Sequence, residues 1–143
     1  VKHTRQTYAK KKSREANYRR RRWLTDPAYR LASNLRRRVR LALRGKCKSA
    51  ATQALLGCTA EECLAHIEAQ FTEGMAHDNI HVDHIVPCAS FNLDNVEEQR
   101  QCFHYTNLQP LFAVDNLSKG AKITERAANR KWNGTVWVDK VLE

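Results

Sequence analysis

The sequence lacks a long apolar run, a Cys-x-x-Cys pair and any internal repeat. No apolar stretch of the 143 residues approaches the ~18 residues that cross a membrane, and the first residues contain no apolar segment of a secretory signal. Five cysteines are an odd number for a disulfide framework, so free thiols in a reducing cytosol are the simpler interpretation. We therefore expect a cytoplasmic protein without a membrane span.

Acidic residues are nearly absent from the first third of the chain. Residues 1–48 hold 18 Lys and Arg but only Glu15 and Asp26, a net charge of +16, whereas residues 49–143 have a net charge of −6. Such asymmetry indicates that one end of the molecule holds a polyanion, and nucleic acid is the leading candidate. An anionic membrane surface and a merely solvated run of charges are the alternatives.

The basic third is predicted to be helical. Residues 1–24 carry no apolar stripe wide enough for burial, which favours a helix or arm that is mobile without its ligand. Residues 26–45 predict an amphipathic helix, with Asp26 as N-cap, Pro27 in the first turn and Gly45 at its end. The residues expected to face the core recur every four positions: Leu31, Leu35, Val39 and Leu43.

The remaining residues predict a mixture of short helices and strands, and the fold class is therefore α+β. The alternating, β-branched residues 81–86 predict a strand that Pro87 ends. The other expected helices are a short one at 49–56, one from a capping box at Thr59 to about residue 74, a short one capped near Asn95, and one from Asp115 or Asn116 to about residue 130. A second strand is expected at 105–113, and a small strand or hairpin at 132–138, with Asn133-Gly134 as its turn.

Three short segments carry residues suited to chemistry. They are Asp83-His84-Ile85-Val86-Pro87, Asn107-Leu108-Gln109-Pro110-Leu111 and Asp115-Asn116-Leu117-Ser118-Lys119-Gly120. In this order and spacing they resemble the HNH endonuclease family, and the wording around them is similar to small phage-type HNH proteins. The resemblance implies N-terminal basic helices followed by a ββα-metal finger, which is a two-stranded hairpin plus a helix.

Phosphodiester hydrolysis needs an activated water on one side of phosphorus and stabilised charge on the leaving oxygen opposite. A histidine is easily held neutral near pH 7, and the resemblance assigns His84 as the general base. It assigns Asp83 and Asn116 to one Mg²⁺ or Mn²⁺ ion, which prefers oxygen ligands. Asn107 is expected to help place the base, and the products are expected to carry 5′-phosphates.

Three of these positions leave alternatives open. Lys119 is a candidate phosphate contact or a solvated lysine. His81 shares a strand face with Asp83, and is either a third ligand or phosphate contact, or a half-buried strand histidine. Asn107 is alternatively a turn-forming residue. Adjacent strand residues such as Asp83 and His84 point to opposite faces, so a single site requires a strongly twisted hairpin.

Zinc is not expected from the cysteines. The HNH family often carries two Cys-x-x-Cys pairs that bind a structural zinc around the finger, and this sequence contains neither pair. Cys88 and Cys102 stand isolated in the sequence. An apolar core in place of a structural zinc is therefore the prediction.

The basic region is expected to bind duplex DNA through phosphate contacts. Tyr8, Tyr18 and Trp23 either stack on bases or anchor this region to the core. The candidate DNA-binding residues are Arg19, Arg20, Arg21, Arg22, Arg36, Arg37, Arg38 and Arg40.

The combined prediction is a metal-dependent endonuclease that nicks or cleaves DNA, such as a phage homing or nicking enzyme acting as a monomer in the host cytoplasm. A non-catalytic nucleic-acid-binding module and a toxin-like or RNA-directed nuclease are the competing classes. The expected organisation is a basic helical DNA-binding region at 1–48, a helical connector at 49–79, the nuclease finger at 80–130 and a C-terminal extension at 131–143.

Overall fold

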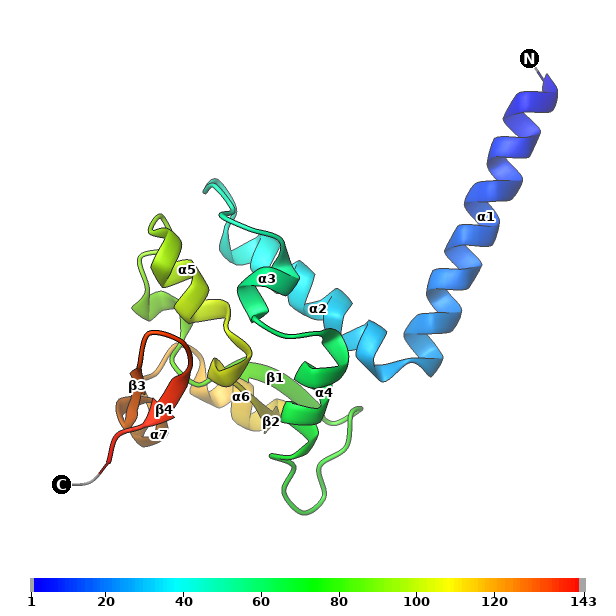
Figure 1. Cartoon of the computed structure of the whole chain (residues 1–143). Coiled ribbons are helices and arrows are strands. Elements are labelled where there is room, and N and C mark those ends of the chain that lie inside the picture. Colours follow the sequence, from blue (N-terminus) through cyan, green and yellow to red (C-terminus); the bar gives the residue numbers. More distant parts are fainter. Residues whose placement is uncertain (1, 142–143) are drawn as a thin grey trace.

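The computed structural model describes residues 2–141 as a mixture of helices and two small antiparallel sheets, which confirms the α+β class (Figure 1). None of the described helices combines the length and hydropathy that crossing a membrane requires. The helices are α1 (Lys2–Thr25), α2 (Pro27–Ala42), α3 (Thr52–Leu56), α4 (Ala60–Glu68), α5 (Val96–Phe103), α6 (Ala113–Lys119) and α7 (Glu125–Ala128), with short 3₁₀ turns η1 (Cys88–Ser90) and η2 (Tyr105–Asn107). The strands are β1 (Ile80–His84), β2 (Leu108–Phe112), β3 (Arg130–Trp132) and β4 (Trp137–Asp139).

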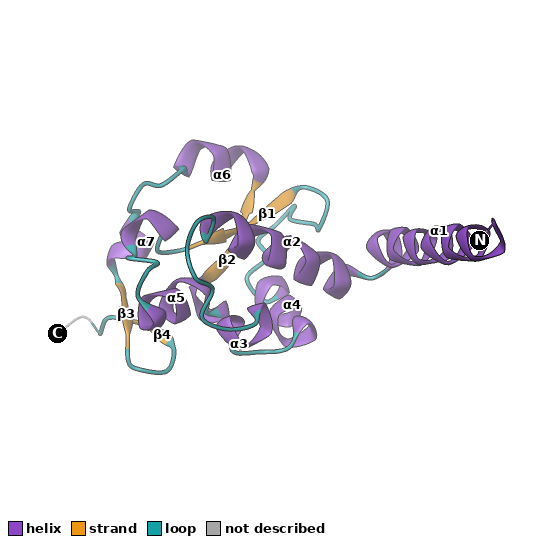
Figure 2. Ribbon diagram, turned by 90° about the horizontal axis from the view of Figure 1, so that it is seen from above, coloured by secondary structure: helices purple, strands orange, loops and turns teal. Residues whose placement is uncertain are grey.

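Helix α1 extends away from the rest of the chain (Figures 1 and 2). From Thr4 onwards its side chains are exposed except for the half-buried Arg22, whose Nη2 lies 2.6 Å from Asp26 Oδ2. Tyr8 and Tyr18 are 71% and 60% exposed, so these two aromatic residues do not anchor α1 to the core. Arg22 therefore ties the C-terminal end of α1 to the start of α2.

Helix α2 begins as the sequence predicts. The Oδ1 atom of Asp26 accepts a hydrogen bond of 2.9 Å from the backbone N–H of Tyr29, and Pro27 occupies the first turn, where its missing donor costs nothing. The helix ends at Ala42 rather than near Gly45, which lies in the following turn with φ +76°. The predicted apolar face is confirmed, and its buried members are Leu31, Leu35, Val39 and Leu43.

The central feature is the hairpin of β1 and β2, which is followed directly by α6. The strands pair antiparallel, from Ile80 opposite Phe112 to His84 opposite Leu108. Although paired, they are separated by η1, α5 and η2 in the chain. Leu108 is fully buried in the apolar cluster that α2 and α4 form against the hairpin, with Leu31, Leu35, Leu56, Cys63 and Ile67.

A second apolar cluster joins the other half of α2 to α5. Its buried members are Val39, Leu43, Leu55, Leu93, Cys102 and Phe103. Helix α2 therefore contributes to both clusters, and it holds α5 and the hairpin in one body.

The segment after β2 differs from the sequence prediction. A single helix from Asp115 or Asn116 to residue 130 is wrong, because α6 begins at Ala113 and ends at Lys119. Gly120 follows with φ +53° and ψ −128°, a conformation that ends the helix, and the Thr124 side chain then caps the separate α7. Helix α4 likewise ends at Glu68 rather than near residue 74, although its predicted capping box is confirmed.

The predicted C-terminal hairpin is confirmed as β3 and β4, with Trp132 opposite Trp137. It packs against the body, because the Trp137 indole N–H donates to the backbone oxygen of Gln101 at 2.8 Å. Arg130 also donates to the backbone oxygen of Thr106 at 2.7 Å. The hairpin of β3 and β4 thus packs on α5 and η2, the segments that connect β1 to β2 in the chain.

The close approach of Gly57, after α3, to His104, after α5, can be tested by substitution. It ends α3 with φ +72°, and a Cβ atom there would lie 2.7 Å from His104 Nε2. We expect Gly57→Ala to lower the free energy of unfolding in urea by about 1–3 kcal/mol, because a left-handed backbone and overpacking both oppose the methyl group. Gly45→Ala is the matched control, since Gly45 has φ +76° but no atom within 4 Å of its Cβ position. Equal losses for the two variants would contradict the close approach of His104.

Candidate active site

Asp83 is buried on the face of β1 that α6 covers. Its side chain is 6% exposed, and Oδ2 lies 3.1 Å from Lys119 Nζ and accepts a second bond of 3.0 Å from Gln109 Nε2. Lys119, itself 9% exposed, also donates to the backbone oxygen of His84 at 3.1 Å. The alternative of a solvated lysine is therefore wrong. Across residues 2–141, no hydrogen bond engages the other carboxylate oxygen, Oδ1.

His81 and Asn116 meet next to this ion pair. Asn116 Nδ2 lies 3.1 Å from His81 Nδ1 and donates to the ring when that nitrogen is unprotonated. His81 and Asp83 are two residues apart on β1, and Asn116 and Lys119 are one turn apart on α6. The two predicted metal ligands, Asp83 and Asn116, therefore belong to the same contact between strand and helix.

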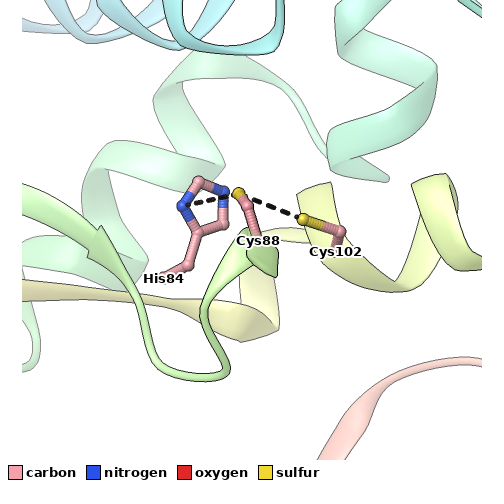
Figure 3. Close-up of side chains that lie close together, drawn as sticks. All are labelled: His84, Cys88 and Cys102. Carbon is pink, nitrogen blue, oxygen red and sulfur yellow. Dashed lines mark hydrogen bonds between the residues drawn. The ribbon is translucent and has the colours of Figure 1, made fainter. Parts of the chain in front are cut away.

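His84 has different neighbours. Its Nδ1 lies 3.7 Å from Cys88 Sγ, and its ring meets the Phe103 ring edge-on, with centroids 6.0 Å apart. Cys102 Sγ lies 3.3 Å from Cys88 Sγ and donates to it (Figure 3). The contacts of Asp83 come from α6 and β2, whereas those of His84 come from η1 and α5. The structure thus forms two side-chain contacts between β1 and α6, Asp83 with Lys119 and His81 with Asn116. Among the described residues, Lys119 also reaches His84, through the backbone oxygen of that residue.

The two cysteines perturb each other's acidity. The pKa of the Cys88 thiol is lowered to about 4, mainly by the hydrogen bond from Cys102, with His84 and Arg38 adding to the effect and burial opposing it. The donation and burial raise the pKa of the Cys102 thiol. The pKa of Cys88 is thus shifted down and that of Cys102 up by the same hydrogen bond.

Asn107 connects the end of β1 to the end of α5. Its side chain is fully buried, with Oδ1 accepting from the Val86 N–H at 2.9 Å and Nδ2 donating to the backbone oxygens of Val86 and Cys102 at 3.0 Å each. Its own backbone oxygen accepts from the Ile85 N–H at 2.8 Å. Asn107 thus fixes the path of the chain on both sides of His84, and a catalytic part for it stays a prediction.

A groove of ≈ 390 Å³ lies between α2, α4 and β1, and we call it the basic groove for its three arginines. Its floor is largely apolar, with Leu31, Leu35, Leu41, Leu64, Ile67, Ile80 and Val82 in the lining. His81 and Asn116 line one wall, and Arg30, Arg37 and Arg38 line the other. Among the other predicted DNA-binding residues, Arg36 and Arg40 are exposed on α2, Arg19, Arg20 and Arg21 are exposed on α1, and Arg22 is engaged with Asp26.

Sequence reasoning missed the residues that support Asp83 from behind. The Oε1 atom of Gln109 accepts from Arg126 Nη1 at 2.7 Å, and Arg126 Nη2 donates to Gln70 Oε1 at 2.9 Å. Gln70 also donates to the backbone oxygen of Leu108 at 3.2 Å. Gln109 lies inside the second motif segment, and Gln70 belongs to Gln70-Phe71-Thr72, a segment similar to small phage-type HNH proteins. No sequence pattern marks Arg126.

Comparisons with known proteins give two relatives whose function is not described. The chain is 37% identical over 98 residues to uncharacterized protein L246 of Acanthamoeba polyphaga mimivirus, covering 66% of this chain and 43% of the relative. It is 36% identical over 107 residues to uncharacterized protein L426 of the same virus, covering 71% and 47%. The chain spans less than half the length of these curated relatives. No protein-family profile and no solved structure matches it.

The buried ion pair predicts a large and specific effect on stability. Lys119→Met leaves the Asp83 carboxylate buried without its partner, and we expect the free energy of unfolding in urea to fall by about 3–5 kcal/mol. Changing Asp83 to Asn in the same protein should restore part of this loss, because the unpaired charge is gone.

The surface pair of Lys46 and Asp94 is the matched control, since its nitrogen–oxygen distance is 2.6 Å but the Asp94 side chain is 66% exposed. Lys46→Met should cost at most about 1 kcal/mol. Similar losses for Lys46→Met and Lys119→Met would contradict a special role for the buried pair.

Proposed function

We propose that this protein is a metal-dependent endonuclease of the HNH type that nicks DNA, with residues 80–130 as its ββα-metal finger. The observation that carries the proposal is the packing of α6 on β1, where Asp83 contacts Lys119 and, two residues earlier on the strand, His81 contacts Asn116 at the basic groove. His84 follows Asp83 on the same strand, and Asn107 lies immediately before β2. These residues follow the chain order of the HNH pattern, which supports the proposal, although Asn107 precedes β2 and Asn116 lies in the middle of α6.

The donor atoms suit a hard divalent cation. Asp83 offers Oδ1, because Lys119 and Gln109 hold only Oδ2, and Asn116 offers an amide oxygen. Carboxylate and amide oxygens are ligands of Mg²⁺ and Mn²⁺, and the imidazole of His81 is a candidate third donor. When bound, the ion would supply positive charge to the phosphate and to the departing 3′ oxygen.

His84 supplies the base in this proposal. Its ring is held by Cys88 and Phe103, and its backbone is tied to Lys119 and flanked by the bonds of Asn107. A neutral imidazole positioned in this way can accept a proton from water. Because His84 and Asp83 have neighbours from different elements, the scissile phosphate would have to lie beside the end of β1, between the two side chains.

The basic groove would bring the DNA to this place. Arg37 and Arg38 share it with His81 and Asn116, so phosphates bound along α2 lead to the proposed metal ligands. The exposed arginines of α1 would extend the same basic surface along an arm. Phosphate contacts of this kind position a duplex without reading its sequence.

A plasmid-nicking assay tests the enzyme. We expect the protein to convert supercoiled plasmid to the nicked form with Mg²⁺ or Mn²⁺. The reaction should stop in EDTA and resume when the metal is restored. His84→Ala should reduce the rate by about 10²–10⁴-fold, the usual contribution of a general base, while DNA binding is retained. Asn116→Ala should raise the Mg²⁺ concentration required, whereas Asn129→Ala, a half-buried asparagine after α7, should not.

Each alternative gives a different result in this assay. Undiminished nicking by a folded His84→Ala protein would remove His84 from the mechanism, and nicking that survives chelation would remove the metal. DNA binding without any metal-dependent nick would favour a non-catalytic binding module. Preferential digestion of RNA over duplex and single-stranded DNA would identify an RNA-directed nuclease.

The groove arginines are tested by the salt dependence of DNA binding. With about six phosphate contacts, the affinity of the wild type should fall by ~10³-fold between 50 and 200 mM salt. Replacing both Arg37 and Arg38 by Ala should weaken binding to all duplexes alike and reduce the slope of log K against log salt by about 2. Lys131→Ala, exposed on β3 outside the basic region, is the control and should leave the slope unchanged.

A further inference from the structure

Two cysteines and the proposed base, His84, converge from three different elements. His84 lies at the end of β1, Cys88 opens η1, and Cys102 lies in the last turn of α5 (Figure 3). One ligand atom of each residue lies within 4.8 Å of the other two. In the part of the chain that the structure describes, this is the one group of three such side chains close enough to share a metal ion.

The separations match those of a tetrahedral thiolate and imidazole site. Zinc bonds of about 2.3 Å to sulfur and about 2.0 Å to nitrogen imply tetrahedral edges of about 3.8 Å between two sulfurs and about 3.5 Å between sulfur and nitrogen. The observed distances are 3.3 Å between the Cys88 and Cys102 sulfurs and 3.7 Å between Cys88 Sγ and His84 Nδ1. Small side-chain movements would therefore suffice to bind an ion.

Burial and access also suit a metal site. Cys102 is fully buried and His84 is 5% exposed, so their donor atoms are held by packing rather than by solvent. Cys88 is only half-buried, so its sulfur is the member of the group that lies nearest to solvent. The other close cysteine pair, Cys58 and Cys63, has no third ligand of this kind within the described residues.

We propose that His84, Cys88 and Cys102 bind a thiophilic cation such as Zn²⁺, and that the bound cation inhibits DNA nicking by occupying His84. The inhibitory part rests on the proposed function, whereas the binding part does not. On binding, each cysteine coordinates as a thiolate, any thiol proton passes to the buffer, and His84 donates the lone pair of one ring nitrogen. A neutral imidazole has only one such lone pair, so a coordinated His84 has none left to accept a proton from water.

The type of donor atom distinguishes this site from the proposed Mg²⁺ site, although Asp83 of the Mg²⁺ site directly precedes His84 in the chain. Asp83 and Asn116 present hard oxygen donors toward α6, whereas the cysteines present soft sulfur donors from η1 and α5. Mg²⁺ should therefore not occupy the cysteine site. A thiophilic ion should prefer it to the carboxylate and amide.

Binding is tested with Co²⁺, which reports thiolate ligation in its absorption spectrum, and with Zn²⁺ as the competitor. The full-length protein, held reduced, should take up one equivalent of Co²⁺ with thiolate-to-cobalt charge-transfer bands, and Zn²⁺ should displace it. Cys88→Ala should weaken binding by at least about 100-fold, beyond the 10–100-fold typical of losing an outer-shell partner. Cys58→Ala removes a thiol from the other cysteine pair and should leave the titration unchanged.

Cys102 is fully buried in the core, so replacing it would also affect stability. Cys88→Ala and His84→Ala are therefore the primary variants, and thermal unfolding verifies that each is folded. Loss of imidazole in His84→Ala should leave two thiolates and a weaker complex. Absence of charge-transfer bands in the wild type would overturn the metal site, as would bands that persist unchanged in Cys88→Ala.

Inhibition is measured separately, as the nicking rate in excess Mg²⁺ with increasing Zn²⁺, relative to each protein's own rate without zinc. Wild type and Cys58→Ala should be inhibited at the Zn²⁺ concentration that fills the site, and Cys88→Ala should require at least about 100-fold more. Equal zinc sensitivity of wild type and Cys88→Ala would overturn the inhibitory role. A wild type that never nicks without zinc would instead contradict the proposed function, and the Co²⁺ titration would still decide the binding site.

Discussion

A carboxylate and an ammonium group are buried against each other where α6 meets β1. Neither Asp83 nor Lys119 could be buried alone, because an isolated ion in an apolar environment costs several kcal/mol. Their pairing, with the Gln109 amide and the His84 carbonyl as further partners, determines which turn of α6 lies against which residue of β1. Asn116 lies one helical turn before Lys119 on α6, and the same packing brings its side chain into contact with His81. The geometry of the candidate site therefore depends on this single ion pair.

The neighbouring residues Asp83 and His84 lie in chemically different surroundings. Alternation along the strand directs Asp83 toward oxygen and nitrogen groups on α6 and β2, and His84 toward sulfur and an aromatic ring on η1 and α5. Asn107 holds the segments that carry the second set in place. A hard and a soft set of potential metal ligands are thereby built on adjacent residues. In our proposals, His84 would accept a proton only while the soft set is empty.

Helix α2 joins the charge pattern to the fold. Its apolar face contributes to both buried clusters, and its arginines line the groove that ends at His81 and Asn116. The charge split at residue 48 is thus not a boundary between two structural units, because half of the basic region belongs to the core. Only α1 stands apart, since its side chains have no apolar stripe to bury.

The sequence by itself determined the features that depend on neighbours in the chain. The cap at Asp26, the capping box of α4, the buried face of α2 and the turn at Gly134 follow from local hydrogen bonds, fixed backbone angles and helical periodicity. The predicted helix from residue 115 or 116 to 130 is wrong, because Gly120 ends α6. The sequence alone does not reveal this end, since a glycine can also lie inside a helix. Cys88 and Cys102, which look isolated in the sequence, are brought together only by tertiary packing, as are Lys119 with Asp83 and Arg126 with Gln109. These contacts depend on how α5, α6 and α7 pack on the hairpin, and that packing arises from the burial of distant side chains and leaves no spacing in the sequence to reveal it.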